Sequence, residues 1–405
     1  MKRIIFITNN SLPIIGATSV CVHNVAKQLV YDGFEVHVVC GGNSGKEKCV
    51  FDGVEVHKVL TPLCMQNSSK FSKNKRRIAY MINCISKILY MRLYPMRSLI
   101  YRNRLYSEVE KLIHNFNEEI VLVATYTPIE ACSALIELKK KYKNVKTCFY
   151  STDTLSNEKG NSALLPQSFR EKRGLKWEFD ILRAVDTALI MECHQKHYFS
   201  SVFAPYHHKM RLANFPLLVK PTSPHFDDKI KSKLHFVYAG TLDKSLRNPT
   251  FLCDLLLKMC KIKPMFATFL GGGNCDDIMS KYNISSNGQV RHIGMQPHDV
   301  AIKILEESDV LLSIGNAESP MSPSKIYEYM STGTPIIHTY SWGNDPCLVP
   351  LKTYGNALLI SEKESIDVDK ITTFLNTCRI LSFEEVERLF YKSTPGFTAR
   401  LISNI

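Results

Sequence analysis

The feature that most constrains the fold is an alternation of short apolar strands and helices that runs through both halves of the chain. Near the start, the strand Ile4–Thr8 precedes helical apolar spacing over Ser19–Tyr31. In the second half, the strand Leu234–Tyr238 precedes a helix expected over Pro249–Lys261. Strands separated by helices of this length form parallel sheets. The sequence therefore predicts an α/β protein with two doubly wound, Rossmann-like domains that face each other across a cleft.

The length of 405 residues favours two domains. A stretch from Asn214 to Pro224 that is interrupted by prolines and serine is typical of an interdomain linker. We predict an N-terminal domain over 1–218, a C-terminal domain over 219–390, and a segment over 391–405 that packs back on the N-terminal domain.

Hydrophobic and charged contents of 45% and 22% are those of a soluble globular protein. The thirteen cysteines are odd in number and form no C-x-x-C pair, which favours reduced thiols in a cytosol and argues against a zinc site. Because no uncharged stretch reaches ~18 residues, no transmembrane helix is expected. These observations predict a cytoplasmic protein, with peripheral attachment to the inner face of the cell membrane as an added possibility.

The region 66–106 is strongly basic, with ten lysines and arginines and no acidic residue. Apolar residues at helical spacing, from Ile78 to Leu89, lie among these charges. The pattern suits a helix that lies on an anionic membrane surface, and it equally suits an amphipathic helix packed on its own domain. No nucleic-acid-binding motif accompanies the charges, so we expect no nucleic-acid partner.

A second informative stretch follows the apolar strand Asp309–Ile314. Ser322 or Ser324 can cap a helix there, and Lys325 and Glu328 lie in its first turns. Small residues and a cation at a helix N-terminus are suited to a diphosphate, and a carboxylate one turn later can accept hydrogen bonds from ribose hydroxyls. The alternative is an ordinary capped helix of an α/β domain.

Turns after other strands add to this pattern. Gly240 and Thr241 directly follow a strand, as a turn that binds phosphate or base would, and Lys244 and Arg247 come just beyond. The glycines 271–273 end the next strand, where absent side chains allow a ligand to approach the backbone. In the N-terminal half, Gly16 lies in the connection after the first strand.

Together these features resemble the GT-B glycosyltransferases, specifically the retaining nucleotide-sugar transferases of family 4. The resemblance covers nearly the whole chain. It depends on the first strand with Gly16, on Tyr238–Leu242, Phe269–Gly273, Ser308–Leu312 and Pro323–Tyr329, and on Gly333-Thr334-Pro335. The Pro-Ser-Lys-x-x-Glu-Tyr variant is similar to a branch common among bacterial surface-polysaccharide transferases.

The resemblance implies roles for matching residues. Glu328 should hold the ribose, and Arg247, with Lys244 as the competing choice, should contact the diphosphate. The implied donor-binding set also includes Gly16, Gly240, Thr241, Gly272, Ser322, Ser324 and Lys325. The nucleotide sugar is then a substrate, and the resemblance implies neither a metal nor a separate cofactor.

Two departures from the family pattern concern catalytic groups. The first acid of the family's Glu–seven residues–Glu motif would fall at Pro320, and Glu318 is the nearby candidate to replace it. Where many relatives have a histidine after the fourth N-terminal strand, Tyr126 is the nearest match. Asp153 follows the next strand and could line the acceptor site, or it could be a cap or turn residue. Glu178, on a predicted helix, is expected to be exposed.

The resulting hypothesis is a metal-independent, hexosyltransferase-like enzyme that moves a sugar, with retention, from a nucleotide-diphosphate sugar to a hydroxyl of a glycan or lipid-linked acceptor in surface-polysaccharide biosynthesis. The rivals are a nucleotide-sugar epimerase of the same fold and a catalytically inactive nucleotide-binding protein. His57, His207 and His208 are expected to be surface or internally satisfied histidines.

Overall fold

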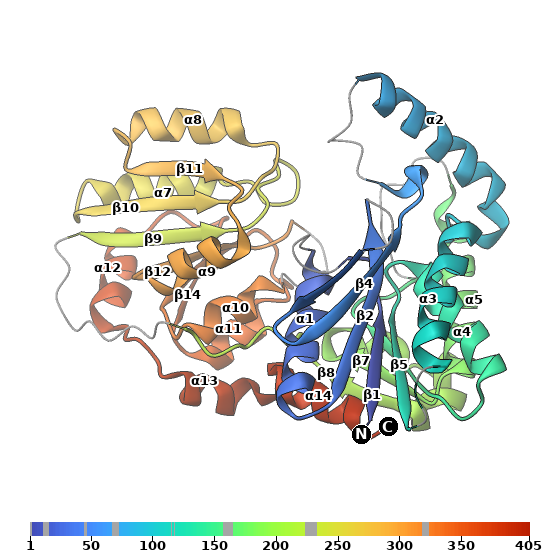
Figure 1. Cartoon of the computed structure of the whole chain (residues 1–405). Coiled ribbons are helices and arrows are strands. Elements are labelled where there is room, and N and C mark those ends of the chain that lie inside the picture. The colour runs from blue at the N-terminus through green and yellow to red at the C-terminus, as the bar shows by residue number, and fades with distance from the viewer. Residues whose placement is uncertain are drawn as a thin grey trace. The chain divides into compact units, whose positions relative to one another are not determined.

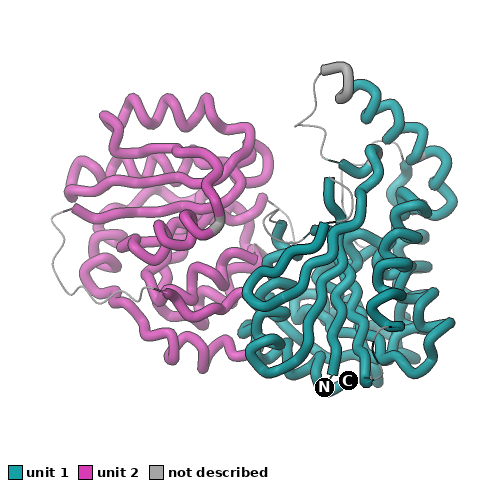
Figure 2. Tube along the Cα trace, viewed as in Figure 1, with its two compact units in different colours: residues 1–216, 392–405 teal, residues 217–391 magenta. Residues whose placement is uncertain are grey.

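The computed structural model describes residues 2–10, 16–43, 47–66, 73–114, 116, 118–156, 165–222, 233–317 and 324–405. The chain divides into two compact units (Figure 2). Unit 1 comprises residues 1–216 and 392–405, and unit 2 comprises residues 217–391. The division falls close to the expected boundary, and the last residues belong to the first unit.

Unit 1 is built on one sheet of eight described strands. Its strands are β1 (Arg3–Ile7), β2 (Glu35–Gly42), β3 (Glu47–Phe51), β4 (Val54–Leu60), β5 (Ile120–Thr125), β6 (Lys146–Ser151), β7 (Thr187–Met191) and β8 (Met210–Ala213). They lie in the order β3-β4-β2-β1-β5-β6-β7-β8, and all pairs are parallel except β3 with β4.

Helices cover both faces of this sheet (Figure 1). The helices of unit 1 are α1 (Ala17–Tyr31), α2 (Lys73–Leu89), α3 (Leu99–His114), α4 (Ile129–Lys141), α5 (Gln167–Ala184), α6 (Gln195–Tyr198) and α14 (Pro395–Ser403). Residues of α3, α4 and α5 share one core with the sheet, and residues of α1 and α14 share the other. The C-terminal helix α14 packs against α1.

The central strand β1 explains why helices must cover both faces of this sheet. Ile4 and Phe6 point into the core under α1, and Ile5 and Ile7 point into the core under α3 and α4. Successive strand residues face opposite sides, so an unbroken apolar run is stable only where both sides are buried. The strand's continuous hydrophobicity therefore specifies an internal strand between two helical layers.

Unit 2 is built on a sheet of six described strands, all parallel (Figure 1). They are β9 (Leu234–Ala239), β10 (Met265–Leu270), β11 (Val290–Gly294), β12 (Val310–Ile314), β13 (Ile336–Tyr340) and β14 (Ala357–Ser361). The helices are α7 (Thr250–Cys260), α8 (Asp276–Ser285), α9 (His298–Glu306), α10 (Lys325–Ser331), α11 (Leu348–Tyr354), α12 (Val368–Thr377) and α13 (Phe383–Phe390). The order is β11-β10-β9-β12-β13-β14.

Both sheets reverse their winding direction at one point, β1 with β5 in unit 1 and β9 with β12 in unit 2. Connections leave in opposite directions there, which opens a crevice at the carboxyl ends of the two strands, where ligands of doubly wound sheets bind. The α/β class with two parallel-sheet domains is thus confirmed. The sequence missed the edge strand β3, which pairs only with β4 and has little buried surface of its own.

Candidate functional site

The turn after β9 lies at the switch point of unit 2. The Gly240 amide donates to the Leu270 carbonyl at 2.9 Å, and the Leu242 amide donates to Gly272, also at 2.9 Å. Gly271 has φ +122°, and a Cβ there would lie 2.0 Å from the Gly240 carbonyl oxygen. The turns after β9 and β10 therefore contact each other backbone to backbone, which only glycine at position 271 permits.

The other predicted glycines differ in what their surroundings require. A Cβ on Gly240 would come within 2.8 Å of the Tyr238 hydroxyl. Added at Gly272 or Gly16, a Cβ would make only ordinary contacts, at 3.5 Å with Met295 and 3.6 Å with Ser19. The protein's own packing does not require glycine at these last two positions, so both leave room for a ligand near the backbone.

Arg247 and Lys244 occupy different environments beyond this turn. The Arg247 Nε donates to Asn316 Oδ1 at 2.6 Å, and Asn316 is fully buried just after β12. This bond joins the segments that follow β9 and β12. By contrast, Lys244 is exposed and its Nζ pairs with Asp277 Oδ2 at 2.7 Å. Only Arg247 is therefore fixed at the switch point by a buried partner.

Glu328 lies on α10, the helix after β12, where its side chain is only 11% exposed. Its Oε2 is buried and accepts no hydrogen bond from the described residues, although Lys325 Nζ lies 3.9 Å away. The next residue, Tyr329, is buried and fixes the helix. Its hydroxyl accepts from the Ala239 amide at 2.6 Å and donates to the Ala239 carbonyl at 3.0 Å. These bonds hold α10, the helix that carries Glu328, against the end of β9.

The start of α10 is only partly described. Ser324 occupies the position before the helix, but its backbone is helical and its side chain makes no capping hydrogen bond. A capping side chain needs an extended backbone to reach back to the amides, which explains the difference. Glu318 and Ser322 lie outside the described residues. Thr241 is exposed, and its carbonyl accepts from the Tyr238 hydroxyl at 3.2 Å.

In unit 1, the switch point also gathers polar side chains. The hydroxyls of Thr8 and Thr125, at the ends of β1 and β5, lie 3.1 Å apart. Tyr126 follows, and its hydroxyl lies 3.4 Å from Asp153 Oδ2 after β6. The structure therefore places Tyr126, the nearest match to the family's histidine, beside Asp153, the residue predicted for the acceptor side.

His194, which the sequence reasoning missed, adds a third group to this edge. Its Nε2 lies 3.6 Å from Asp153 Oδ1. Burial lowers the pKa of His194, against the opposing influence of Asp153. A neutral imidazole beside a carboxylate can accept a proton. Its position just after the apolar run of β7 was the available signal, because carboxyl ends of parallel strands share one edge.

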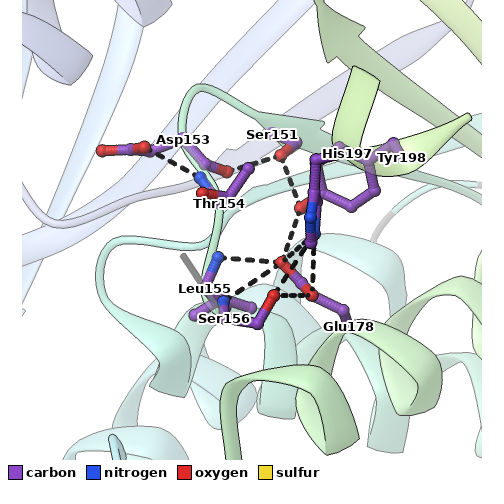
Figure 3. Close-up of polar contacts among 8 residues, drawn as sticks. All are labelled: Ser151, Asp153, Thr154, Leu155, Ser156, Glu178, His197 and Tyr198. Carbon is purple, nitrogen blue, oxygen red and sulfur yellow. Dashed lines mark hydrogen bonds and ion pairs between the residues drawn. The ribbon is translucent and has the colours of Figure 1, made fainter. Parts of the chain in front are cut away.

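Glu178 was predicted to be exposed, and that prediction is wrong: its side chain is fully buried. Figure 3 shows its carboxylate at the centre of a network. Oε1 accepts from the Leu155 amide at 2.9 Å and the Tyr198 hydroxyl at 3.2 Å, and Oε2 accepts from the Ser156 hydroxyl at 2.7 Å. His197 Nε2 lies 3.2 Å from Oε2. These bonds attach the segment after β6 to α5.

The network determines where Asp153 lies. The Ser151 hydroxyl donates to the Asp153 carbonyl at 2.8 Å and contacts the Tyr198 hydroxyl at 3.1 Å (Figure 3). Asp153 Oδ1 accepts from the Thr154 amide at 2.8 Å, so this carboxylate is in part a turn residue, while its other oxygen faces Tyr126. Glu178 is consequently a positioning residue for the loop that carries Asp153.

Comparisons with known proteins agree on the fold. No family model and no curated protein matches this sequence. Among solved structures, the catalytic domain of starch synthase IV from Arabidopsis thaliana, bound to ADP and acarbose, is 10% identical, with 99% of this chain and 98% of that chain covered and a TM-score of 0.56. HepE from Anabaena in complex with UDP-glucose is 14% identical, with 99% and 96% covered and a TM-score of 0.53.

WaaG, a glycosyltransferase involved in lipopolysaccharide biosynthesis, is 12% identical, with 99% and 100% covered and a TM-score of 0.51. These alignments extend over both units at identities that establish architecture alone. The chain therefore has the GT-B glycosyltransferase fold, with two Rossmann-like domains.

Proposed function

We propose that this protein is a retaining glycosyltransferase that moves a sugar from a nucleotide-diphosphate sugar to a hydroxyl of a glycan or lipid-linked acceptor. The observation that carries the proposal is the buried Glu328 Oε2 with no hydrogen-bond donor among the described residues. A buried carboxylate without donors is costly, so a ligand that supplies hydroxyls at this point gains affinity. The paired hydroxyls of a ribose suit such an acceptor.

The remaining donor groups fit a diphosphate beside that ribose. Arg247, oriented by buried Asn316, is a fixed cation at the switch point, and Gly272 leaves backbone space. In transfer, the bond between the anomeric carbon and the phosphate oxygen breaks, and the acceptor oxygen bonds to that carbon. The acceptor proton passes to the departing diphosphate, whose charge Arg247 stabilises. Lys244 is the weaker contributor because Asp277 already neutralises it.

The acceptor would bind to unit 1 at the edge formed by Tyr126, Asp153 and His194. Two hydrogen-bonding oxygens and an imidazole are suited to orient a sugar hydroxyl. HepE holds UDP-glucose and starch synthase IV holds ADP, which supports a nucleotide sugar as donor. The role of WaaG in lipopolysaccharide biosynthesis supports a surface-polysaccharide product. The proposed place of action is the cytoplasm.

The first test is nucleotide binding. Thermal shifts with a panel of nucleoside diphosphates and nucleotide sugars should reveal one preferred base, and Glu328→Ala should lose the shift. The matched control is Glu307→Ala, because the Glu307 carboxylate, just after α9, also lies 3.9 Å from a lysine, Lys303, but is 59% exposed. If a folded wild-type sample shows no shift with any member, the donor site is disproved.

Turnover then separates the transferase from its rivals. The preferred donor is incubated with and without glycan or lipid-linked acceptors, and the anomeric configuration of any product is read by NMR. A product that keeps the donor's configuration supports the proposal. Isomerisation of the donor without acceptor would indicate an epimerase, and binding without turnover would indicate an inactive protein.

We further propose that α2 attaches the protein to an anionic membrane surface. Six apolar side chains of α2 are exposed: Ile78, Met81, Ile82, Ile85, Ile88 and Leu89. This argues against the alternative in which that face packs on its own domain. Basic residues of the same region, including exposed Arg77 and Arg92, would add attraction to anionic headgroups. No helix in the described parts of the chain is long and apolar enough to cross a membrane.

Liposome sedimentation tests this attachment. Wild-type protein should sediment with vesicles that contain phosphatidylglycerol at low salt and remain free with neutral vesicles. Ile85→Asp with Ile88→Asp should abolish the binding, whereas Val349→Asp, an exposed apolar residue of unit 2, should not. Equal sedimentation of all three proteins would contradict the proposal.

A further inference from the structure

Two histidines form a buried pair in unit 1, away from the candidate acceptor edge. His37 lies near the start of β2 and His57 lies on β4, both on the sheet face that α3 covers. Their exposed fractions are 3% and 2%. His37 Nδ1 lies 3.1 Å from His57 Nε2. Because β2 begins at the opposite edge from Thr125 and Tyr126, this pair belongs to neither of the sites described above.

Carboxylates lie on the outer side of each imidazole. Glu35 Oε1 is 2.9 Å from His37 Nε2, and Glu108 Oε1 is 3.5 Å from His57 Nδ1, which makes no hydrogen bond with the described residues. A carboxylate only accepts, so the outer Nε2 of His37 should carry the hydrogen. In a neutral His37 the inner Nδ1 then presents a lone pair toward His57 Nε2, which makes it available to a cation that lies between the two rings.

A third donor completes this arrangement. Glu55, paired in register with His37, places its Oε2 3.4 Å from His37 Nδ1 and 3.7 Å from His57 Nε2. Arg3 pairs with Glu35 and Lys111 with Glu108. No lysine or arginine of the described chain pairs with Glu55. The carboxylate whose charge no such cation balances is therefore the one that faces both inner nitrogens.

The three separations bracket those expected for one face of a tetrahedral zinc site. Bonds of ~2.0–2.1 Å at tetrahedral angles place neighbouring donor atoms roughly 3.3–3.4 Å apart. In an octahedral ion with bonds of ~2.1 Å, neighbours would lie about 3.0 Å apart. The observed values of 3.1, 3.4 and 3.7 Å centre on the tetrahedral spacing. Since Glu55 is 52% exposed, water can reach the fourth position.

We infer that His37, His57 and Glu55 bind one Zn²⁺, with water as the fourth ligand and with Glu35 orienting the imidazole of His37. Such carboxylate–histidine–metal arrangements are usual around zinc. The lack of paired cysteines, which argued against a zinc site, does not bear on ligands of this kind. The site joins β2 and β4, so we assign it a stabilising role in unit 1 rather than a part in sugar transfer.

A second group of three possible ligands lies in unit 2: His338, Asp345 and Cys347. It differs from the proposed zinc site in water access and in the protonation of one ligand. All three residues are almost completely buried, which leaves no route for a water ligand. Burial also raises the pKa of the Cys347 thiol well above its usual value, so it stays protonated. The expected stoichiometry is therefore one metal ion per chain.

The test uses the full-length protein without an affinity tag, stripped with a chelator and titrated with Zn²⁺ and Co²⁺. We expect one ion per chain, a higher melting temperature with Zn²⁺, and the strong visible absorption of tetrahedral Co²⁺. Glu55→Gln, an exposed change that should leave the fold intact, should weaken Zn²⁺ binding by at least about tenfold, and Glu35→Gln by ~10–100-fold.

His23→Asn is the matched control, because His23 is also buried and bonds a carboxylate, Asp52 at 2.9 Å, but has no second imidazole. It should bind Zn²⁺ as the wild type does. The inference is overturned if the stripped wild type binds no Zn²⁺, which would leave a shared proton between the imidazoles. It is also overturned if folded Glu55→Gln binds with unchanged affinity, or if bound Co²⁺ shows the weak absorption of six-coordinate ions.

Discussion

Glu178 in unit 1 and Glu328 in unit 2 are both helical glutamates with little exposure, yet their carboxylates accept very different numbers of hydrogen bonds from the protein. Glu178 accepts from two backbone amides and two hydroxyls, and an imidazole lies beside it. Glu328 has one oxygen that accepts nothing from the described residues. A carboxylate saturated by the protein supports structure, whereas one left unsatisfied at a switch point is available for a ligand.

The difference also shows in the glycines nearby. Gly174 lets the segment after β6 approach α5, since a Cβ there would lie 2.4 Å from the Leu155 carbonyl. That contact is internal and closes the site around Glu178. Gly272, in the turn after β10 of unit 2, would make only an ordinary contact through an added Cβ. Burial alone therefore does not distinguish a structural acid from a binding acid, but the count of donors does.

The largest expected effect is on stability. Glu178→Ala leaves several buried donors without an acceptor and should lower the free energy of unfolding by about 3–5 kcal/mol. Urea denaturation of the purified variant measures this, with Glu171→Ala, an exposed change on the same helix, as control. A loss below about 1 kcal/mol would show that the network contributes little and would remove the contrast with Glu328.

The next effect is on affinity. Glu328→Ala removes the acceptor proposed for the ribose hydroxyls, and bonds to a charged group contribute about 1.5–3 kcal/mol. The dissociation constant of the preferred nucleotide should therefore rise ~10–100-fold by isothermal titration calorimetry. Stability should change little, because no hydrogen-bond donor among the described residues loses a partner at Oε2. Unchanged affinity in a folded variant would place the nucleotide elsewhere.

The sequence was sufficient for the fold class because continuous apolar strands such as Ile4–Ile7 are stable only between two helical layers. It also pointed to Glu328, whose side chain the structure leaves 11% exposed on α10, while its part in nucleotide binding stays a prediction. The burial of Glu178 could not be predicted, because its donors come from the segment 155–156 and from Tyr198, which only the tertiary structure brings to α5.

The amphipathic helix α2 shows the same limit. Its apolar spacing was visible, but whether those side chains meet the protein or the solvent depends on where the chain places the helix. Likewise, His37 and His57 are distant in sequence, and only the register of β2 with β4 brings them together. Periodicity defines local structure, whereas the meeting of distant polar residues depends on strand order.

A substitution at Gly174 gives opposite expectations from local and tertiary structure. Alanine is favoured over glycine within a helix by about 1 kcal/mol, so propensity alone predicts that Gly174→Ala stabilises the protein. The clash with the Leu155 carbonyl predicts instead a loss of about 1–3 kcal/mol, as for other overpacked positions. Thermal and urea denaturation decide between them, and any gain in stability would mean that the segment can move away from α5.

The smallest expected effect separates the two cations of the donor turn. Lys244 is exposed and already paired with Asp277, so Lys244→Met should weaken nucleotide binding by less than about fivefold. Arg247→Met, which removes a cation fixed by buried Asn316, should weaken it by about tenfold or more. Titration of both variants with the same nucleoside diphosphate gives the order directly. The reverse order would mean that the diphosphate displaces Asp277 as the partner of Lys244. In that case the ion pair of Lys244 and the hydrogen bond of Arg247 in the ligand-free protein do not identify the group that binds the diphosphate.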